Sequence, residues 1–204
     1  MSARAAGGPP VSSDPDPDPG PDPAFLVWAR GLCEDLWLTL GEIDPSNDFL
    51  AFLWQVFTSN GEAPSDRVAP LIQQRRIELA RHYMRYFVVR ARQETGLAVE
   101  EAMSFSAPDA LEPTGLTQVG NLSIQGIHRA DVARDTAEAV QDYVMARYRT
   151  VWPQCPAHRL GLHPVLTDGV PQWNCSSGDH STPMLSSDLG GPGTVESRPH
   201  GRMR

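Results

Sequence analysis

The placement of proline and glycine constrains this chain more than any other feature of its sequence. The 204 residues include 19 prolines and 17 glycines, more than ordinary globular usage, and many of them lie near the two ends. Residues 1–22 end in an alternation of Asp and Pro from Asp14 to Asp22, which can form neither a helix nor a sheet ladder. Residues 181–204 are rich in Ser, Gly and Pro. We therefore expect a disordered tail at each end.

Between these tails, apolar side chains recur at helical spacing. An Asp-Pro pair begins two of the patterns, at Asp22 and at Asp44, where the Asp caps a helix and the Pro suits its first turn. Gly96 ends a third and longer pattern. The ranges that we expect to be helical are 24–40, 45–60, 70–95, 98–103 and 130–150. They predict a mainly α fold, a helical bundle of four to five helices with a small C-terminal β-hairpin.

The chain changes character after residue 150. Two short apolar stretches, 162–166 and 170–174, flank Asp168-Gly169, and Asp-Gly is a preferred pair for a tight hairpin turn. Residues 104–127 contain several Pro and Gly and predict a loop, with at most a short extended piece at 116–124. The resulting division is a disordered tail (1–22), a helical domain (23–150), a Cys/His β-hairpin module (151–180) and a second disordered tail (181–204).

The most specific local pattern is formed by cysteine and histidine in the hairpin module. Cys155-Pro-Ala-His158 places two ligand-type residues on one turn, and Cys175 and His180 follow the hairpin. Two such pairs, brought together by a short hairpin, supply the four ligands of a tetrahedral zinc site. The pattern predicts a structural zinc ion in a zinc-ribbon-like tip, with His163 as a substitute ligand.

Two other interpretations of this pattern stay open. In the first, the hairpin packs on Trp152 and Trp173, and the cysteines are ordinary buried thiols. In the second, the zinc is catalytic, which requires an open coordination position and a general base; Asp168 and Asp179 are weak candidates for that base. The chain contains no G-x-S-x-G, H-E-x-x-H or G-x-G-x-x-G signature. We therefore assign no catalytic residue.

Arginine covers the polar side of the helix expected at 70–95. All 17 basic residues of the chain are arginine. At about 100° per residue, Arg81, Arg85 and Arg92 fall close together, and Arg75 lies at the other edge of the polar arc. Such a face is either an ordinary solvated surface or a site for anions or nucleic acid.

A second charged face lies on the helix expected at 130–150. Asp131, Asp135, Glu138 and Asp142 follow one another at spacings of four, three and four residues, which places the four carboxylates on one side of a helix. The inward glutamates and the Glu-x-x-His pair of a di-metal site are missing from this pattern. The face is therefore a solvated surface or a docking site for a basic partner.

Charge and hydropathy limit the classes of function. The formal net charge of -8 argues against a chain that coats nucleic acid along its whole length, but not against local binding. No apolar run is long enough for a membrane helix, no signal peptide is evident, and three cysteines are too few for a secreted disulfide framework. We expect a cytoplasmic, non-enzymatic interaction or regulatory protein that binds another protein and no membrane.

Two alternative functions remain open. One is a nucleic-acid-binding protein that uses the arginine face and the Cys/His hairpin, and the other is a zinc-dependent hydrolase. The sequence leaves the oligomeric state open.

Overall fold

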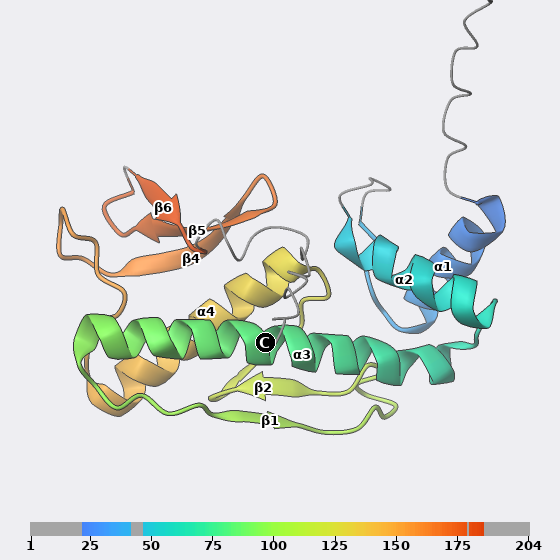
Figure 1. The fold of residues 1–204 in the computed structure, drawn as a ribbon, viewed down its shortest axis with the longest axis horizontal. Coiled ribbons are helices and arrows are strands. Elements are labelled where there is room, and N and C mark those ends of the chain that lie inside the picture. The colour runs from blue at the N-terminus through green and yellow to red at the C-terminus, as the bar shows by residue number, and fades with distance from the viewer. Residues whose placement is uncertain (1–21, 42–46, 179, 186–204) are drawn as a thin grey trace, which may run out of the picture.

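The computed structural model describes residues 22–41, 47–178 and 180–185 of the chain (Figure 1). These residues form four helices and two three-stranded antiparallel sheets. The prediction of a helical bundle with a single C-terminal hairpin is therefore wrong, because six strands accompany the helices. The elements are α1 (Pro23–Asp35), α2 (Asp48–Asn60), α3 (Ser65–Thr95), β1 (Met103–Phe105), β2 (Thr117–Val119), β3 (Leu122–Ser123), α4 (Arg129–Tyr148), β4 (Leu162–Thr167), β5 (Val170–Cys175) and β6 (Ser181–Pro183).

The longest helix, α3, is the axis on which the other elements pack. Its buried residues recur every three or four positions from Val68 to Ala91, the spacing that places apolar side chains on one helix face. Gly96 ends the helix at a φ of 71°, in the left-handed region that glycine adopts without strain. In Figure 1, α3 crosses the whole molecule, with α1 and α2 near one end, β4–β6 drawn above it and β1 and β2 below it.

Helices α1 and α2 pack on the first half of α3. Each begins at a side-chain cap: the carboxylate of Asp22 accepts a backbone hydrogen bond at 2.8 Å, and the amide oxygen of Asn47 accepts one at 2.9 Å. Buried side chains of α1, α2 and the start of α3 form one apolar cluster with Ile127. The cap expected at Asp44 lies outside the described residues, and α2 begins after Asn47.

The first sheet, β1–β3, occupies a region for which the sequence predicts a short helix and a loop. The helix expected at 98–103 is absent: residues 98–102 are irregular, and Met103 begins β1. So short a helix would have few internal hydrogen bonds, and the carbonyl of Ala102 instead accepts a bond from Gly120 N at 2.8 Å. Strands β2 and β3 agree with the extended piece expected at 116–124.

The second sheet, β4–β6, contains the predicted hairpin and one further strand. Strands β4 and β5 pair along their full length, and Asp168 and Gly169 form the turn at positive φ values of 50° and 73°, as such two-residue turns require. Strand β6 pairs with β5, so this sheet extends past the boundary set at residue 180. The rest of the two expected tails, 1–21 and 186–204, lies outside the described residues.

Sheet β4–β6 shares one apolar core with α3, α4 and the first sheet. Its buried Trp173 and Cys175 belong to the same cluster as Phe87 of α3 and Val140 of α4. The ring of Trp173 meets those of Phe87 and Trp152 edge-on, with centroids 6.0 and 5.9 Å away. These contacts pack the sheet against α3 and α4. None of the helices in the described part of the chain has both the length and the apolar character needed to cross a membrane.

Candidate metal centre

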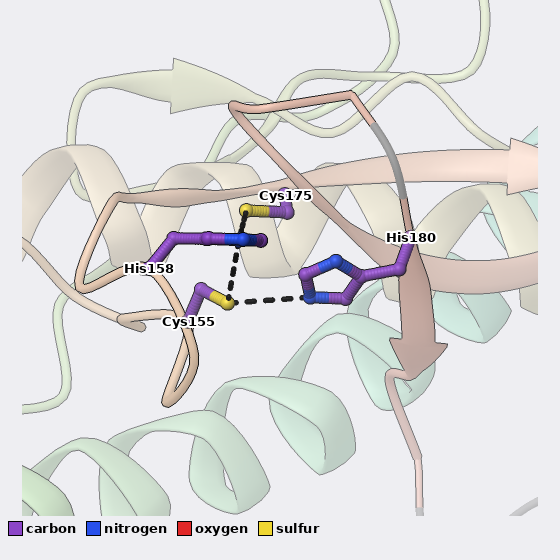
Figure 2. A group of neighbouring side chains, drawn as sticks. All are labelled: Cys155, His158, Cys175 and His180. Atoms are coloured by element: carbon purple, nitrogen blue, oxygen red, sulfur yellow. Dashed lines mark hydrogen bonds between the residues drawn. The ribbon is translucent and has the colours of Figure 1, made fainter.

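Four side chains from three segments meet beside sheet β4–β6 (Figure 2). They are Cys155, His158, Cys175 and His180, and their ligand atoms all lie within 4.8 Å of one another. These are the four residues that the spacing selects as zinc ligands. They lie close enough together to hold a metal ion.

Cys155 and His158 belong to a tight turn before β4. The backbone N–H of Arg159 donates to the carbonyl of Cys155, and the N–H of Cys155 donates to the carbonyl of Leu160, both at 2.8 Å. Arg159 has a positive φ of 56°, which reverses the chain direction. The Cys-Pro-Ala-His spacing therefore closes a turn that aims both side chains at one point, with Cys155 buried and His158 exposed.

Cys175 and His180 flank a second turn, between β5 and β6. Cys175 shares a face of β5 with Trp173, because side chains two residues apart in a strand point the same way, and both are buried. Gly178, at a φ of 79°, donates its N–H to the carbonyl of Cys175 at 2.8 Å, and Cys175 N donates to the carbonyl of His180 at 3.1 Å. This turn returns His180 to the side of Cys175.

Side chains of α3 and α4 fix the segment that carries the first pair. The buried amide of Gln141 on α4 donates to the carbonyls of Trp152 and Leu162. The indole N–H of Trp152 donates to the carboxylate of Glu94 on α3 at 2.9 Å. Both ends of the segment around Cys155 are thus tied to the helical base.

Three of the four sulfur–nitrogen distances are close to those expected between ligands of one tetrahedral metal ion. Sγ of Cys155 lies 3.2 Å from Nε2 of His180 and 3.7 Å from Nδ1 of His158, and Sγ of Cys175 lies 3.4 Å from the same Nδ1. Zinc bonds of about 2.3 Å to sulfur and about 2.0 Å to nitrogen place such ligands about 3.5 Å apart at the corners of a tetrahedron. The three distances bracket this value, and all four donor atoms lie close enough together to hold one metal ion.

A hydroxyl group favours the charged form of one cysteine. Ser177 Oγ donates to Sγ of Cys175 at 3.1 Å and lies 3.3 Å from Nδ1 of His158. This hydrogen bond, opposed by burial and assisted by Ser177 N, His158 and Cys155, lowers the pKa of Cys175 from 9.0 to about 6. The thiolate, which is the form that binds metals, is therefore favoured at neutral pH. The Cys and His spacing contains no signal for Ser177, which only the folded turn brings to the sulfur.

His163, the predicted substitute ligand, is not among the clustered residues. It follows Leu162, which pairs with Cys175 across the sheet, so its side chain points to the opposite face. Its Nε2 lies 2.9 Å from Oγ of Ser176. The alternation of side chains along β4 thus separates His163 from the four other residues.

The four clustered residues include neither of the carboxylates considered as general bases, Asp168 and Asp179. Asp168 lies in the β4–β5 turn, at the end of the hairpin opposite to Cys175, and the five residue steps along β5 correspond to roughly 17 Å. Asp179 lies outside the described residues. Within the described chain, the clustered donors are two sulfur and two nitrogen atoms.

The four arginines predicted to bind anions lie in different environments. Arg75 donates to a carboxylate of α2, and Arg92 donates to a backbone carbonyl beyond α3 at 2.7 Å. Arg81 makes no hydrogen bond or ion pair with any described residue, and the side chain of Arg85 is 63% exposed. Arg75 and Arg92 are therefore engaged by hydrogen bonds within the protein, whereas the exposed Arg85 lies 3.7 Å from Glu101 and Arg81 is half-buried.

The acidic face of α4 is partly engaged as well. Asp135 accepts hydrogen bonds from Gly126 N at 3.0 Å and from the neighbouring arginine, so it anchors the segment that enters α4. Asp131 is half-buried, whereas Glu138 and Asp142 are exposed. A docking site for a basic partner would thus be limited to the exposed part of this face.

The third cysteine lies apart from the metal centre. Cys33 is buried in α1 within the α1–α2 cluster, and burial raises the pKa of its thiol to about 11. It therefore stays protonated at neutral pH. All three cysteines are free.

Comparison with models of known protein families, with curated proteins and with solved structures gives no match to this chain. The assignment of the site therefore depends on its donor atoms and their geometry.

Proposed function

We propose that this chain is a non-enzymatic, cytoplasmic binding protein whose β4–β6 sheet is held by one structural zinc ion, and that its partner is another protein. The observation that carries the proposal is the convergence of Cys155, His158, Cys175 and His180 within 4.8 Å. Two thiolates and two imidazoles are the donor set of many structural zinc sites.

The number of protein ligands supports a structural role for the ion. Four ligands complete a tetrahedral shell, which leaves no position for water or substrate. A hydrolase needs an open position and a nearby general base, and no carboxylate joins the four donors in the described residues. A zinc-dependent hydrolase is therefore the less supported alternative.

The ion would connect β6 to the turn before β4. Strand β6 has three residues and pairs with β5, and so short a strand adds little stability alone. His180 directly precedes β6, so an ion bound to His180 and Cys155 joins this strand to the loop before β4. Metal binding of this kind contributes directly to the free energy of folding.

Exposed apolar side chains support a protein partner. Val27 in α1 is 72% exposed and Trp37, just after it, is 70% exposed, and tryptophan is enriched in protein interfaces. The three free cysteines suit a reducing compartment, which is the basis for placing the protein in the cytoplasm.

Replacing zinc with Co²⁺ tests whether the four protein ligands fill the coordination shell of the ion. Co²⁺ binds sites of this type, and its visible spectrum reports coordination geometry and thiolate ligation. We expect a tetrahedral, thiolate-ligated spectrum for the wild-type chain that does not change when azide is added. Cys155→Ser and Cys175→Ser each weaken the thiolate band, whereas His163→Ala, the matched control, leaves the spectrum unchanged.

Two results would contradict the proposal in different ways. A spectrum that shifts with azide indicates an open position and favours the hydrolase. A wild-type chain with native circular dichroism and no cobalt spectrum has no metal centre, and the hairpin then carries ordinary buried thiols.

A further inference from the structure

A shallow, open depression between side chains, called the groove below, lies on the outer face of α3. In the described part of the chain only this helix lines it, and its lining residues recur every three or four positions, on the side opposite the buried face. They are Glu78, Arg81, His82, Arg85, Tyr86, Val89, Arg90 and Gln93.

Positive charge is concentrated on this part of the helix. Between residues 74 and 93 the chain has six arginines and one acidic residue, although the whole chain has a formal net charge of -8. Arg75 and Arg76 make contacts inside the protein, whereas Arg81 and Arg85 line the groove. The groove is therefore a local basic surface on an acidic protein.

Arg81 and Arg85 are available to an external anion. Arg81 makes no hydrogen bond or ion pair with any described residue, and the nearest ion-pair partner of Arg85 is Glu101, at 3.7 Å. One helical turn, about 5.4 Å along the axis, separates the two side chains. Each guanidinium can thus bind a different phosphate of one strand through charge-assisted hydrogen bonds.

An aromatic ring lies beside these arginines. Tyr86 is half-buried, and Phe87 contacts its ring edge-on, with centroids 5.2 Å apart, so its orientation is supported by the core. Val89, which is 47% exposed, adds apolar surface three residues further along. Proteins that bind single strands combine these features, with cations for the backbone and aromatic rings for the bases.

We propose that this groove binds single-stranded nucleic acid, with Arg81 and Arg85 on phosphates and Tyr86 stacked on a base. The site goes beyond the structural zinc ion and does not depend on it. An acidic peptide would pair with the arginines but offers no base to stack on Tyr86, which is why a nucleic acid is the better fit.

Fluorescence anisotropy with a labelled oligo(dT) strand tests the proposal on the full, zinc-loaded chain. Two phosphate contacts on a single strand give a slope of about -1.4 for the logarithm of affinity against that of salt concentration. Affinity then falls about sevenfold between about 50 and about 200 mM salt.

Substitutions of arginines on α3 distinguish direct phosphate contacts in the groove from a general effect of the protein's charge. Arg85→Gln removes one phosphate contact and halves the salt slope, and adding Arg81→Gln brings the slope near zero. Arg67→Gln is the matched control: it makes the same change of charge at an exposed position of α3 outside the groove. It leaves the slope and the affinity unchanged.

Substitutions of the ring test stacking independently of charge. Tyr86→Phe keeps the affinity, whereas Tyr86→Ala lowers it roughly 5- to 160-fold without changing the salt slope. Circular dichroism and thermal unfolding check that each variant is folded. If Tyr86→Ala does not fold, the arginine variants and Tyr86→Phe still test the proposal.

Three outcomes overturn the proposal. The first is no binding of oligo(dT) by the wild-type chain at about 50 mM salt, where the charged contacts are strongest. The second is equal binding by Arg85→Gln and Arg67→Gln. The third is equal affinity for poly-glutamate and oligo(dT), which would assign the groove to an acidic protein instead.

Discussion

Ser177 adjusts the candidate metal centre through a single hydroxyl group. It donates to Sγ of Cys175 at 3.1 Å, and hydrogen bonds of this kind to metal ligands typically change metal affinity 10- to 100-fold. We expect Ser177→Ala to weaken zinc binding by about that factor, measured by competition with a chromophoric chelator. Ser176→Ala is the control, because that hydroxyl donates to the carbonyl of Gly161. Equal losses in the two variants would contradict a specific role for Ser177.

Asp48 joins three helices through its carboxylate. It accepts hydrogen bonds from Arg75 of α3 and from Arg129 N at the start of α4, and Nδ1 of His128 lies 3.7 Å away. Burial acts to raise its pKa, but His128, Arg75 and Arg129 outweigh burial and lower the pKa below the ordinary value of 3.8. Because the folded pKa is the lower one, this stabilisation is complete above the unfolded pKa and is lost as pH falls through the folded value.

We therefore expect Asp48→Asn to lose roughly 2 kcal/mol of unfolding free energy at neutral pH. The difference in unfolding free energy between wild type and variant stays constant down to about pH 5. This gap closes as the pH falls below the ordinary pKa of the carboxyl group. Denaturant unfolding at a series of pH values measures it. Loss of metal in acid affects both chains equally, so a gap that persists to about pH 2 would contradict this role of the carboxylate.

At the scale of single residues, the sequence identifies four clustered donors because tight turns are local. The spacing of Cys155 and His158 already implies one turn, and the hairpin brings back Cys175 and His180. The sequence alone cannot exclude His163 as a ligand, because that requires the register of β4. It also cannot identify Ser177, because that requires the shape of the second turn.

Among the elements, the first sheet is tied to α3 by buried polar side chains, of which Arg76 makes the most hydrogen bonds. Arg76 is 4% exposed and donates to the carbonyls of Gly126 and Gly115, both at 3.2 Å, and to Oγ1 of Thr114 at 3.1 Å. These bonds tie both ends of the segment that contains β2 and β3 to the helix.

We expect Arg76→Met to lose roughly 3 kcal/mol of unfolding free energy, because buried carbonyl groups are left without donors. Amide hydrogen exchange in β1–β3 should accelerate more than exchange in α1 and α2. Arg81→Met, the same substitution at a position without such bonds, should change stability by less than about 0.5 kcal/mol. Equal effects of the two substitutions would contradict the role assigned to Arg76.

The helices were easier to predict than the strands, for a physical reason. The N-cap at Asp22, the C-cap at Gly96 and the apolar spacing act within each helix, so the sequence shows them directly. Strands β1–β3 have two or three residues each and are held by Gln73 and Arg76 of a distant helix. Such long-range hydrogen bonds leave no local pattern. The helix predicted at 98–103 is wrong for the same reason, because the carbonyls of Ala98 and Ala102 accept hydrogen bonds from the distant Tyr148 and Gly120.

At the scale of the whole molecule, the described residues form two apolar clusters joined along α3. One combines α1, α2 and the first part of α3, and the other combines the rest of α3 with α4 and both sheets. The candidate metal centre belongs to the second cluster, through Cys155 and Cys175. A bound ion would therefore stabilise the part of the molecule that carries β4–β6.

Elemental analysis of the purified chain tests the structural zinc ion most directly. We expect about one zinc per chain, which is the stoichiometry of a single four-ligand site. This zinc is lost in the Cys155→Ser, Cys175→Ser double variant and retained in His163→Ala. A wild-type chain without bound metal, or a double variant that keeps its zinc, would contradict a structural zinc ion at these four residues.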